Sequence, residues 1–397
     1  MKITIFSQHF WPENFRINDL AFALSKKVTA INIFTGKPNY SDGKIKKSFQ
    51  SHLPQIKNFK NIEIIRFPII SRGSASSLRL ILNYISYILS VTFFGFFLKK
   101  KLGDIFFVYA TSPIFQAIPA IFLGRLFKRP VVLWVQDLWP ENLVDTGYIK
   151  NKIIIKIVKT FVKIIYDYSD LILCQSQDFY RVIKKITNTN SKIFYNPSNY
   201  KFRARERKNL KKKYFDFYYT GNLGKGQSIS KLLKIFSNEM LIKNKIRLFI
   251  YGGGKEFKLI DNYIKKNKYS NISLNKPVSS KKLKKRINKA DCFILKLNEG
   301  YGLSKTIPAK FQTYLSFGIP ILSINKGIVS NIIKNNKIGY ACSTKNTSDL
   351  YKLIIKIKKL KFKELQQIYK NSEKLYYKNF EINSSCKKLK KYLEALS

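Results

Sequence analysis

A glycine-rich turn that contains a lysine lies in the second half of the chain. The segment 218–229, YYTGNLGKGQSI, runs from a strand-like stretch into a helix-like one and contains Gly221, Asn222, Gly224 and Lys225. Glycines let the backbone turn tightly and expose its N–H groups, and a lysine adds a positive charge beside them. The turn matches neither a Walker loop nor G-x-G-x-x-G, so an ordinary tight turn also explains it when it is taken alone.

Two other segments of this half have the same character. In 250–257, IYGGGKEF, Gly252 and Gly253 follow an apolar run, where a ligand can approach the backbone. We expect a helix over 306–317, with Thr306 as its N-cap and Lys310 in its first turn. The free amides of such a helix bind anions, although a capped surface helix is the alternative for this segment alone. Three anion-binding corners in one half favour a diphosphate ligand.

Polar and aromatic residues gather in two turns of the first half. The segments are 7–21, SQHFWPENFRINDLA, and 134–143, WVQDLWPENL. Their candidate binding residues are His9, Trp11, Glu13, Asn14, Arg16, Gln136, Asp137, Trp139 and Glu141. Aromatic, carboxylate and amide groups in one place are suited to sugar binding, while any single one of them can equally be a structural group.

Length and composition limit the classes of protein to which the chain can belong. The chain has 397 residues, 45% of them hydrophobic, which is enough for two domains with real cores. Four cysteines without a C-x-x-C pair, together with two histidines, provide no zinc site and fit a reduced compartment. No signal-peptide pattern follows Met1, so we expect a cytoplasmic protein.

The formal net charge of +51 predicts attraction to polyanions. Nucleic acid, an anionic membrane and phosphorylated substrates are all candidates. The lysines are dispersed and form no RNP, helix-turn-helix or finger pattern, which argues against nucleic acid. A basic nucleic-acid-binding protein and a non-catalytic Rossmann-type protein are the alternatives to an enzyme.

Short apolar runs alternate with helical periods along both halves, which predicts an α/β fold with doubly wound parallel sheets. The expected strands are KITIFS, AINIFT, IEIIRFP, DIFFVYAT, VVLWVQD, LILCQS and KIFYNP, then FDFYYTG, IRLFIYGGG, DCFILKLN and IPILSIN. We expect domains at 1–199 and 214–375, a basic linker at 200–213, and a C-terminal helix at 376–397 that returns to the first domain. Ligands should lie at the carboxyl ends of the strands, in a cleft between the two halves.

Two helices of the first domain have a membrane-binding pattern. The segment 78–98 is long enough to span a bilayer, but its polar residues recur every three or four positions and form one narrow stripe. In 152–165, four lysines repeat the same spacing among Ile, Val and Phe. Such a basic amphipathic helix is typical of a membrane interface, while packing on the sheet is the alternative. We expect peripheral attachment rather than a span.

Five segments together resemble family-4 glycosyltransferases of the two-domain GT-B fold, especially the WbuB-like branch. They are QHFWPENFRINDLA, TGKPNYSDGK, VQDLWPENLVDTG, TGNLGKGQ and TIPAKFQTYLSFGIPI. The resemblance covers nearly the whole chain. It implies two Rossmann-like domains facing each other across a cleft, and a sugar that moves from a nucleoside diphosphate with retention at the anomeric carbon and without metal or another cofactor. The C-terminal half would bind the donor. The N-terminal half would meet a polyprenyl-diphosphate-linked sugar at the inner face of a bacterial plasma membrane.

The resemblance also implies residue roles and shows departures. The donor-binding set would be Gly221, Asn222, Gly224, Lys225, Gly252, Gly253, Glu299, Thr306, Ile307, Ala309, Lys310, Gln312 and Thr313. Two glutamates that the wider family carries eight residues apart correspond here to Lys305 and Thr313, and the WbuB-like branch also lacks them. Glu299 and Gln312 are the candidates to replace them at the donor ribose. A histidine of many family members corresponds to Gln136, beside Asp137.

The catalytic expectations follow from the charge that develops on the leaving diphosphate. Lys225 and the amides of 306–310, with Lys310 assisting, would stabilise that charge without Mg²⁺. If configuration is retained, the leaving oxygen can take the acceptor's proton. Inversion would require a base, and Asp137 or Glu13 would be the candidates. The resemblance favours UDP-linked N-acetylated deoxyhexoses, such as UDP-L-FucNAc, as donors for O-antigen or capsule synthesis.

Overall fold

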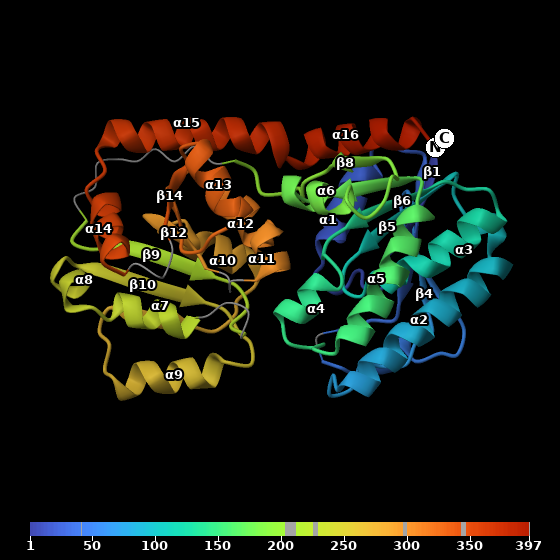
Figure 1. The fold of residues 1–397 in the computed structure, drawn as a ribbon, viewed down its shortest axis with the longest axis horizontal. Coiled ribbons are helices and arrows are strands. Elements are labelled where there is room, and N and C mark those ends of the chain that lie inside the picture. Colours follow the sequence, from blue (N-terminus) through green and yellow to red (C-terminus); the bar gives the residue numbers. More distant parts are fainter. Residues whose placement is uncertain (41, 203–211, 225–228, 297–299, 343–346, 397) are drawn as a thin grey trace. The chain divides into compact units, whose positions relative to one another are not determined.

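The computed structural model describes residues 1–40, 42–202, 212–224, 229–296, 300–342 and 347–396. The chain divides into two compact units, which Figure 1 colours along the sequence. Unit 1 consists of Met1–Asn199 together with Phe380–Ser397, and unit 2 of Tyr200–Asn379. Each unit is an α/β layer structure with its own sheet, so the predicted fold class is confirmed.

The sheet of unit 1 has the order β3-β4-β2-β1-β5-β6-β7-β8 in the described residues. Its strands are β1 (Lys2–Phe6), β2 (Ala30–Gly36), β3 (Gln55–Phe59), β4 (Ile62–Phe67), β5 (Ile105–Ala110), β6 (Val131–Val135), β7 (Leu171–Cys174) and β8 (Ser191–Ile193). The β3–β4 pair is antiparallel and every other pair is parallel. The carboxyl ends of the parallel strands therefore lie along one edge of the sheet, as ligand sites of this sheet type require.

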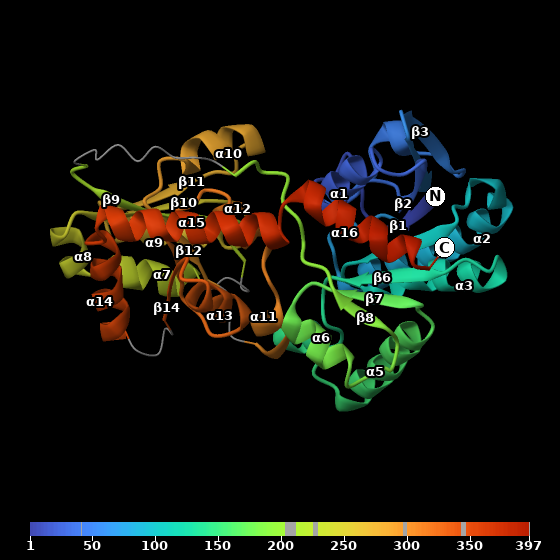
Figure 2. The ribbon, with the colours of Figure 1, turned by 90° about the horizontal axis from the view of Figure 1, so that it is seen from above.

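Helices cover both faces of this sheet (Figure 2). The helices are α1 (Arg16–Leu24), α2 (Ser77–Phe97), α3 (Ile118–Leu126), α4 (Glu141–Asp145), α5 (Lys152–Asp167), α6 (Gln177–Ile183) and α16 (Ile382–Glu394), with 3₁₀ turns η1 (Lys47–Phe49), η2 (Lys99–Lys101) and η3 (Ile114–Ala117). On one face α2, α3, α5 and α6 pack on a core that includes Phe34 and Leu133. On the other, α1 and α16 pack on a core that includes Ile33 and Trp134. Because side chains alternate along each strand, consecutive residues serve opposite cores.

One C-terminal helix was expected at 376–397, but two helices, α15 (Phe362–Asn379) and α16, share this range. Helix α15 ends in unit 2, and α16 begins after Glu381, whose side chain caps it by accepting from the Ser384 amide at 2.7 Å. Phe380 lies against Tyr195 with ring centres 5.3 Å apart, and its carbonyl accepts from the Ser198 amide at 2.8 Å. These contacts explain why the helix is interrupted at this point. The helix therefore returns to unit 1 from Phe380 onward.

Unit 2 has a parallel sheet with the order β11-β10-β9-β12-β13-β14 in the residues that the structure describes. The strands are β9 (Phe215–Thr220), β10 (Ile246–Tyr251), β11 (Ile272–Asn275), β12 (Cys292–Leu295), β13 (Ile321–Ser323) and β14 (Gly339–Ala341). The helices are α7 (Ile229–Phe236), α8 (Glu239–Lys243), α9 (Phe257–Lys266), α10 (Ser280–Ile287), α11 (Tyr301–Lys305), α12 (Ala309–Leu315), α13 (Ile328–Asn335), α14 (Thr347–Lys358) and α15. One face buries Phe217 and Ile250 against α7 and α14. On the other face, Phe293 stacks on Tyr314 of α12 at 4.2 Å.

Candidate functional site

Two glycine-containing loops meet at the carboxyl ends of β9 and β10. The amide of Gly221 donates to the Tyr251 carbonyl at 3.0 Å, and the amide of Leu223 donates to the Gly253 carbonyl at 2.8 Å. A Cβ added at Gly252 would lie 1.9 Å from the Gly221 carbonyl oxygen, so this approach requires glycine. The described parts of the 218–229 and 250–257 segments therefore meet at the ends of their strands. Gly224 and Asn222 lie on the same loop, and Asn222 is exposed.

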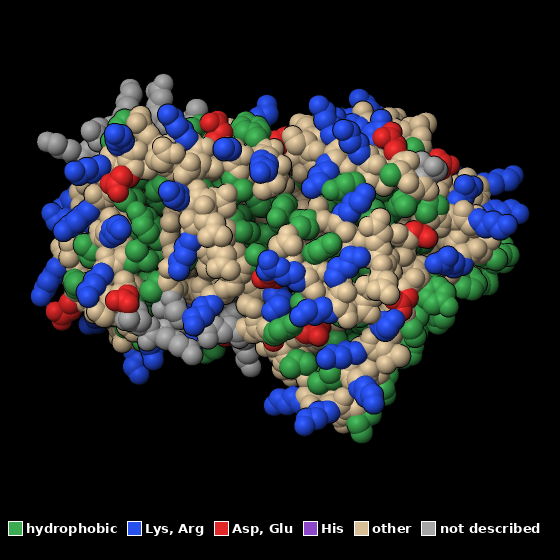
Figure 3. All heavy atoms as spheres, turned by 45° about the horizontal axis from the view of Figure 1, so that its top comes forward, with side chains coloured by type: hydrophobic (Ala, Val, Ile, Leu, Met, Phe, Trp, Pro, Cys, Tyr) green, Lys and Arg blue, Asp and Glu red, His purple; other side chains and the backbone are tan. Residues whose placement is uncertain are grey.

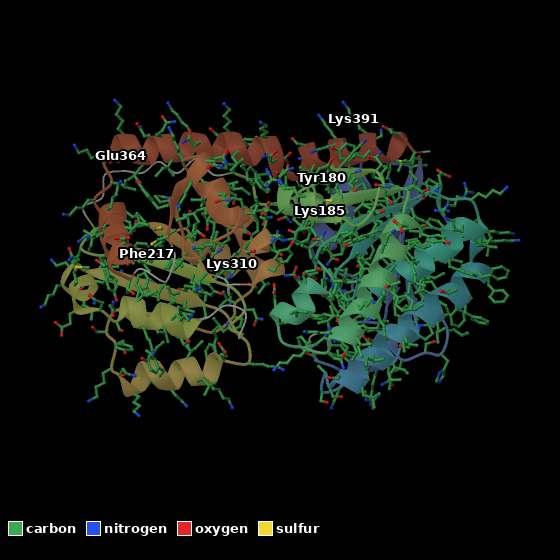
Figure 4. All side chains as sticks on the ribbon, in the orientation of Figure 1. Tyr180, Lys185, Phe217, Lys310, Glu364 and Lys391 are labelled. Carbon is green, nitrogen blue, oxygen red and sulfur yellow. The ribbon has the colours of Figure 1, made fainter. Side chains whose placement is uncertain are left out.

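Lys310 brings a positive charge to this loop junction. Its ammonium lies 2.8 Å from the Tyr219 hydroxyl and 4.0 Å from the centre of the Tyr219 ring. A Cβ built on Gly221 would lie 3.0 Å from the same nitrogen, so Lys310 reaches the end of β9. Figure 4 labels Lys310 on the short helix α12. Burial lowers the pKa of Lys310 to about 7, because the charged form loses hydration.

The helix that begins near Lys310 differs from the expected one. Thr306 was expected to cap it, but α12 begins at Ala309 with Pro308 as N-cap. Thr306 instead ends the preceding helix α11, and its hydroxyl donates to the Gly302 carbonyl at 3.0 Å. The N-cap prediction was wrong because that helical turn sits directly before Pro308. Gly318, shortly after α12, takes the left-handed conformation, with φ of +62°.

Three residues that were expected at the donor are buried: Gln312 and Thr313 of α12, and Ile307 just before it. Gln312 is 1% exposed, and its amide nitrogen can reach the carbonyls of Ala309 at 2.8 Å and Pro308 at 3.0 Å. Thr313 is also buried, and its carbonyl accepts from Ser316. Ile307 is 2% exposed. The Gln312 side chain thus stabilises the first turn of α12. Lys225 and Glu299 lie outside the described residues.

Tyr219 and Tyr314 position this corner, and neither was among the sequence-predicted residues. The hydroxyl of Tyr314 accepts from the Thr220 amide at 2.7 Å and lies 3.1 Å from the Thr220 hydroxyl. It thereby ties α12 to the end of β9. Tyr219 combines the Lys310 contact with a bond from its hydroxyl to the Asn222 carbonyl at 3.3 Å. The two tyrosines were missed because they belong to apolar runs, where the sequence shows only core positions.

In unit 1, Asp137 follows β6 and joins two turns. One carboxylate oxygen accepts from the Ser112 amide at 3.1 Å and hydroxyl at 2.9 Å, and the other accepts from Asn142 at 2.9 Å. Burial raises the pKa of Asp137, and these three hydrogen bonds oppose the shift. The Trp139 indole donates to the Ser112 hydroxyl at 2.9 Å. Asp137 is therefore tied to its neighbours, as a residue that positions a turn would be.

Three buried amide side chains lie at the ends of β6, β7 and β8. Asn196 donates to the Gln136 side-chain oxygen at 2.8 Å, and Gln175 donates to the Gln136 carbonyl at 2.5 Å. The Gln136 side-chain nitrogen and the side-chain oxygens of Gln175 and Asn196 have no hydrogen-bond partner among the described residues. Each of the three residues is less than 9% exposed. These three atoms are enclosed by protein, so they are unsatisfied polar groups in the interior of unit 1. Gln175 and Asn196 were missed because the sequence gives no sign that they meet Gln136.

His9 and Glu13 form a buried pair in the turn after β1. His9 Nδ1 lies 3.3 Å from the Glu13 carboxylate, and the imidazole stacks on Phe15 with centres 5.1 Å apart. Burial lowers the pKa of His9, and the Glu13 contact opposes that shift. The Glu13 carboxylate also accepts from the Tyr40 amide. This turn thus holds Glu13 to its neighbours.

The remaining acceptor-side candidates divide into packed and exposed groups. Trp11 packs against Phe59 at 5.2 Å, and Trp139 packs against Phe115 at 5.5 Å. Both indoles therefore serve packing. Asn14 is exposed, Arg16 is partly buried in the first turn of α1, and Glu141 begins α4.

A pocket of about 870 Å³ opens in unit 1 beside the ends of β2 and β4. Lys37, Lys44 and His52 line it together with apolar residues that include Phe49 and Ile69. Lys37 is 1% exposed, its ammonium donates to the Ser51 carbonyl, and burial lowers its pKa. Cations beside an apolar wall suit an amphiphilic anion. Lys37 and Lys44 both lie in the quoted TGKPNYSDGK segment. Their position after a predicted strand was the sequence signal that could have indicated this site.

Within the described ranges, no group of three or more His, Cys, Asp or Glu side chains could hold a metal ion. Metal independence itself stays a prediction.

Comparisons with known proteins agree with this geometry. Residues 201–375 match the family model described as Glycosyl transferases group 1, over nearly the extent of unit 2. Over 333 residues the chain is 25% identical to the probable glycosyltransferase WbjE of Pseudomonas aeruginosa, across 76% of this chain and 77% of that one. The protein is a glycosyltransferase. The matched residues 201–375 include the junction of the two glycine-containing loops.

Solved structures define the fold of this glycosyltransferase. Sucrose-phosphate synthase from Thermosynechococcus elongatus superposes with a TM-score of 0.76 at 13% identity, over 100% of this chain and 98% of that chain. Anabaena HepE, in a complex with UDP and glucose, gives a TM-score of 0.68 at 12% identity, over 100% of both chains. The fold is GT-B.

Proposed function

We propose that this glycosyltransferase moves a sugar from a nucleoside diphosphate to a polyprenyl-diphosphate-linked glycan, with retention of anomeric configuration. The observation that supports the donor half is the position of Lys310 at the junction of the two glycine loops, 2.8 Å from Tyr219. A cation beside backbone turns at the strand ends is suited to the diphosphate of a nucleotide sugar. HepE, which shares the fold, is described in complex with UDP and glucose.

The reaction needs stabilisation of the charge that grows on the leaving β-phosphate. The bond between the anomeric carbon and the diphosphate oxygen breaks, and the acceptor oxygen bonds to the same carbon. The acceptor's proton passes to the departing oxygen. Lys310, with Lys225 as its sequence-predicted partner, supplies positive charge to that oxygen. Asp137, which three hydrogen bonds tie to its neighbours, positions the acceptor-side turn in this scheme.

On the acceptor side, the pocket beside β2 and β4 suits the lipid diphosphate. Lys37 and Lys44 would pair with the phosphates, and Phe49 and Ile69 would contact the first lipid units. The quoted motifs favour the WbuB-like branch of family 4, and therefore a UDP-linked N-acetylated deoxyhexose such as UDP-L-FucNAc in O-antigen or capsule synthesis. A site on the inner face of a bacterial plasma membrane follows from such an acceptor.

The test is thermal stabilisation of the purified protein by a panel of UDP-, GDP- and TDP-sugars, followed by NMR of the transfer product. We expect UDP-sugars to raise the melting temperature of the wild-type protein but not that of Lys310→Met. The product should have the anomeric configuration of the donor. No stabilisation by any nucleotide sugar would contradict the donor assignment, and an inverted product would contradict retention.

A further inference from the structure

Helix α2 packs on its sheet through its polar side. Asn83 is fully buried: its oxygen accepts from Gln8 at 2.8 Å and its nitrogen donates to the Ile70 carbonyl at 2.6 Å. The Ser86 hydroxyl accepts from the Ile70 amide at 2.9 Å, and the Tyr87 hydroxyl donates to the Phe34 carbonyl at 3.2 Å. The polar stripe seen in the sequence therefore faces the protein.

The opposite side of α2 is apolar and exposed. Its large hydrophobic residues with more than a third of their surface exposed are Leu78, Ile81, Leu82, Ile85, Leu89, Phe93, Phe96 and Phe97. Leu78 is 67% exposed and Leu89 is 64% exposed. A surface helix in water has the reverse orientation, with its apolar stripe toward the core. The outward side of α2 is therefore suited to an apolar medium.

Helices α3 and α5 extend this surface on the same face of the sheet. The exposed residues of α3 are Ile118, Phe122 and Leu126, and those of α5 are Ile153, Ile154, Ile157, Phe161 and Ile164. Figure 3 shows hydrophobic atoms gathered in a band along the right-hand edge. We call these sixteen residues of α2, α3 and α5 the apolar face. A continuous exposed patch of this kind marks an interaction surface.

Positive charges predominate around the apolar face, although Lys163 pairs with Asp167 and Lys101 pairs with Glu63. The segments 77–102, 113–136 and 146–166 contain twelve lysines and arginines and no aspartate or glutamate. The cations are Arg79, Lys99, Lys100, Lys101, Arg125, Lys128, Arg129, Lys150, Lys152, Lys156, Lys159 and Lys163. Lys99 and Lys100, directly after α2, are exposed. A second copy of this chain would bring like charges together, whereas anionic lipid headgroups would neutralise them.

We propose that the apolar face docks on an anionic lipid bilayer, with α2 lying in the plane of the interface. This inference rests on the contacts of unit 1 and not on the transfer reaction. Helix α2 is the one described helix long and apolar enough to cross a membrane. Its polar side is bonded to the sheet, however, and a Cβ on Gly95 would lie 2.7 Å from Leu123 of α3. Crossing would separate α2 from both, so it lies on the surface of the bilayer.

Vesicle flotation tests this proposal with two matched pairs of variants. The apolar variant Leu78→Gln, Ile85→Gln, Leu89→Gln has a control in unit 2, Met240→Gln, Leu259→Gln, Phe362→Gln, whose residues are similarly exposed. The charge variant Lys152→Gln, Lys156→Gln, Lys159→Gln has as control Lys363→Gln, Lys370→Gln, Lys374→Gln on α15, all of them exposed. Vesicles of phosphatidylcholine are compared with vesicles that also contain phosphatidylglycerol.

We expect wild-type protein and both controls to float with the anionic vesicles. The apolar and the charge variant should each bind about a hundredfold more weakly, with unchanged melting temperature. Wild-type binding that is absent, or that both variants retain, would overturn the proposal. A dimer in sedimentation equilibrium that the apolar variant abolishes would identify a second copy as the occupant. Resistance of the wild-type protein to carbonate extraction would overturn the in-plane orientation.

Loss of vesicle binding is separable from failure of the proposed function. The apolar variant should still be stabilised by UDP-sugars and should still hydrolyse the donor slowly in detergent. If the transfer proposal is wrong but the apolar face docks on lipid, vesicle binding will follow the pattern above without any response to nucleotide sugars.

Discussion

The Lys310 ammonium and the Tyr219 hydroxyl lie 2.8 Å apart, and the same ammonium lies 4.0 Å from the centre of the Tyr219 ring. Tyr219 is the penultimate residue of β9, and Lys310 lies in the first turn of α12. The contact therefore joins the two elements at the point where a diphosphate is expected. Burial disfavours the charged form of this lysine in the free protein, and an arriving anion would stabilise it.

The affinity for UDP should depend on pH through Lys310. Burial lowers the pKa of Lys310 to about 7 in the free protein, and a bound diphosphate would raise it. Binding then takes up a proton above that pH, so affinity should fall by up to about tenfold per pH unit between pH 7 and 9. Calorimetric titration with UDP measures this. Lys310→Arg should bind with little pH dependence, and a flat profile in the wild-type protein would remove Lys310 from the phosphate site.

The same lowered pKa has a consequence for stability. The pKa of Lys310 in the folded protein lies below the unfolded value of 10.5. Its contribution to the free energy of unfolding is therefore fully present above pH 10.5 and is lost as the pH falls through about 7. The free wild-type protein should therefore gain stability relative to Lys310→Met as the pH rises from 7 to 10. Urea unfolding at several pH values checks the sign. A difference that shrinks over this range would show that Lys310 is not buried as described.

Gly252→Ala should disrupt the junction of the two loops. The new Cβ would lie 1.9 Å from the Gly221 carbonyl oxygen, and backbone atoms cannot move aside at low cost. We expect a loss of roughly 1–3 kcal/mol in unfolding free energy and weakened UDP binding. Gly224→Ala is the control, because its Cβ would meet Asn222 at 3.4 Å, an ordinary contact. Equal behaviour of the two variants would mean that the close approach has no role.

Lys225 and Asp137 should affect different half-reactions. Lys225→Ala should slow donor cleavage even with water as acceptor, by roughly 2–4 kcal/mol in activation free energy, if Lys225 stabilises the leaving group. Asp137→Asn should impair transfer to the lipid acceptor more than donor hydrolysis, because Asp137 positions the turn through Ser112 and Asn142. Parallel assays of hydrolysis and transfer separate the two. A silent Lys225→Ala beside an inactive Asp137→Asn would reverse the roles.

Activity should survive chelation. The expected positive charge at the diphosphate comes from lysines and backbone amides, and the described residues offer no cluster of three metal-ligating side chains. We expect unchanged transfer rates in EDTA. Loss of activity that Mn²⁺ or Mg²⁺ restores would contradict the metal-independent mechanism.

Lys37→Met should weaken binding of the lipid-linked acceptor while leaving donor hydrolysis intact. Lys37 is buried beside the pocket of unit 1, so its ammonium is placed for a phosphate rather than for bulk solvent. The measurement is the KM for acceptor at saturating donor, which should rise several-fold. Lys57→Met, at an exposed position of strand β3, is the control for loss of a lysine charge from unit 1. An unchanged KM would assign the pocket to another role.

The strands that sequence reasoning missed share one property. β3, β11 and β14 lie at sheet edges, and their residues are mostly exposed or partly buried. Edge strands pair on one side and face solvent, so they lack the continuous apolar runs by which β1 or β6 can be recognised. The central strands of the two parallel sheets could be predicted because their apolar runs are long and continuous. The two glycine-containing loops could be recognised in the sequence, but the close approach of Gly252 to the Gly221 carbonyl could not.

Side-chain partners were harder to predict than positions. The stripe of Asn83 and Ser86 is visible in the sequence, but periodicity does not say which side of a helix faces the sheet. Thr306 and Pro308 both favour a helix start, and the prediction did not allow for α11 directly before them. The meeting of Gln136, Gln175 and Asn196 depends on strand order, which the local sequence does not encode.

Unit 1 is completed by α16, which is synthesised after the whole of unit 2. Cys386, Leu389 and Leu393 of α16 belong to the core of the face that α1 also covers. During synthesis, β1 to β8 leave the ribosome about 190 residues before α16 does. That face of the sheet is exposed in the nascent chain throughout translation of unit 2, so the first unit to begin folding is the last to finish. A protein truncated after Asn379 would expose the side chains of Trp134 and Ile33 on a face prone to aggregation, whereas unit 2 would retain its core.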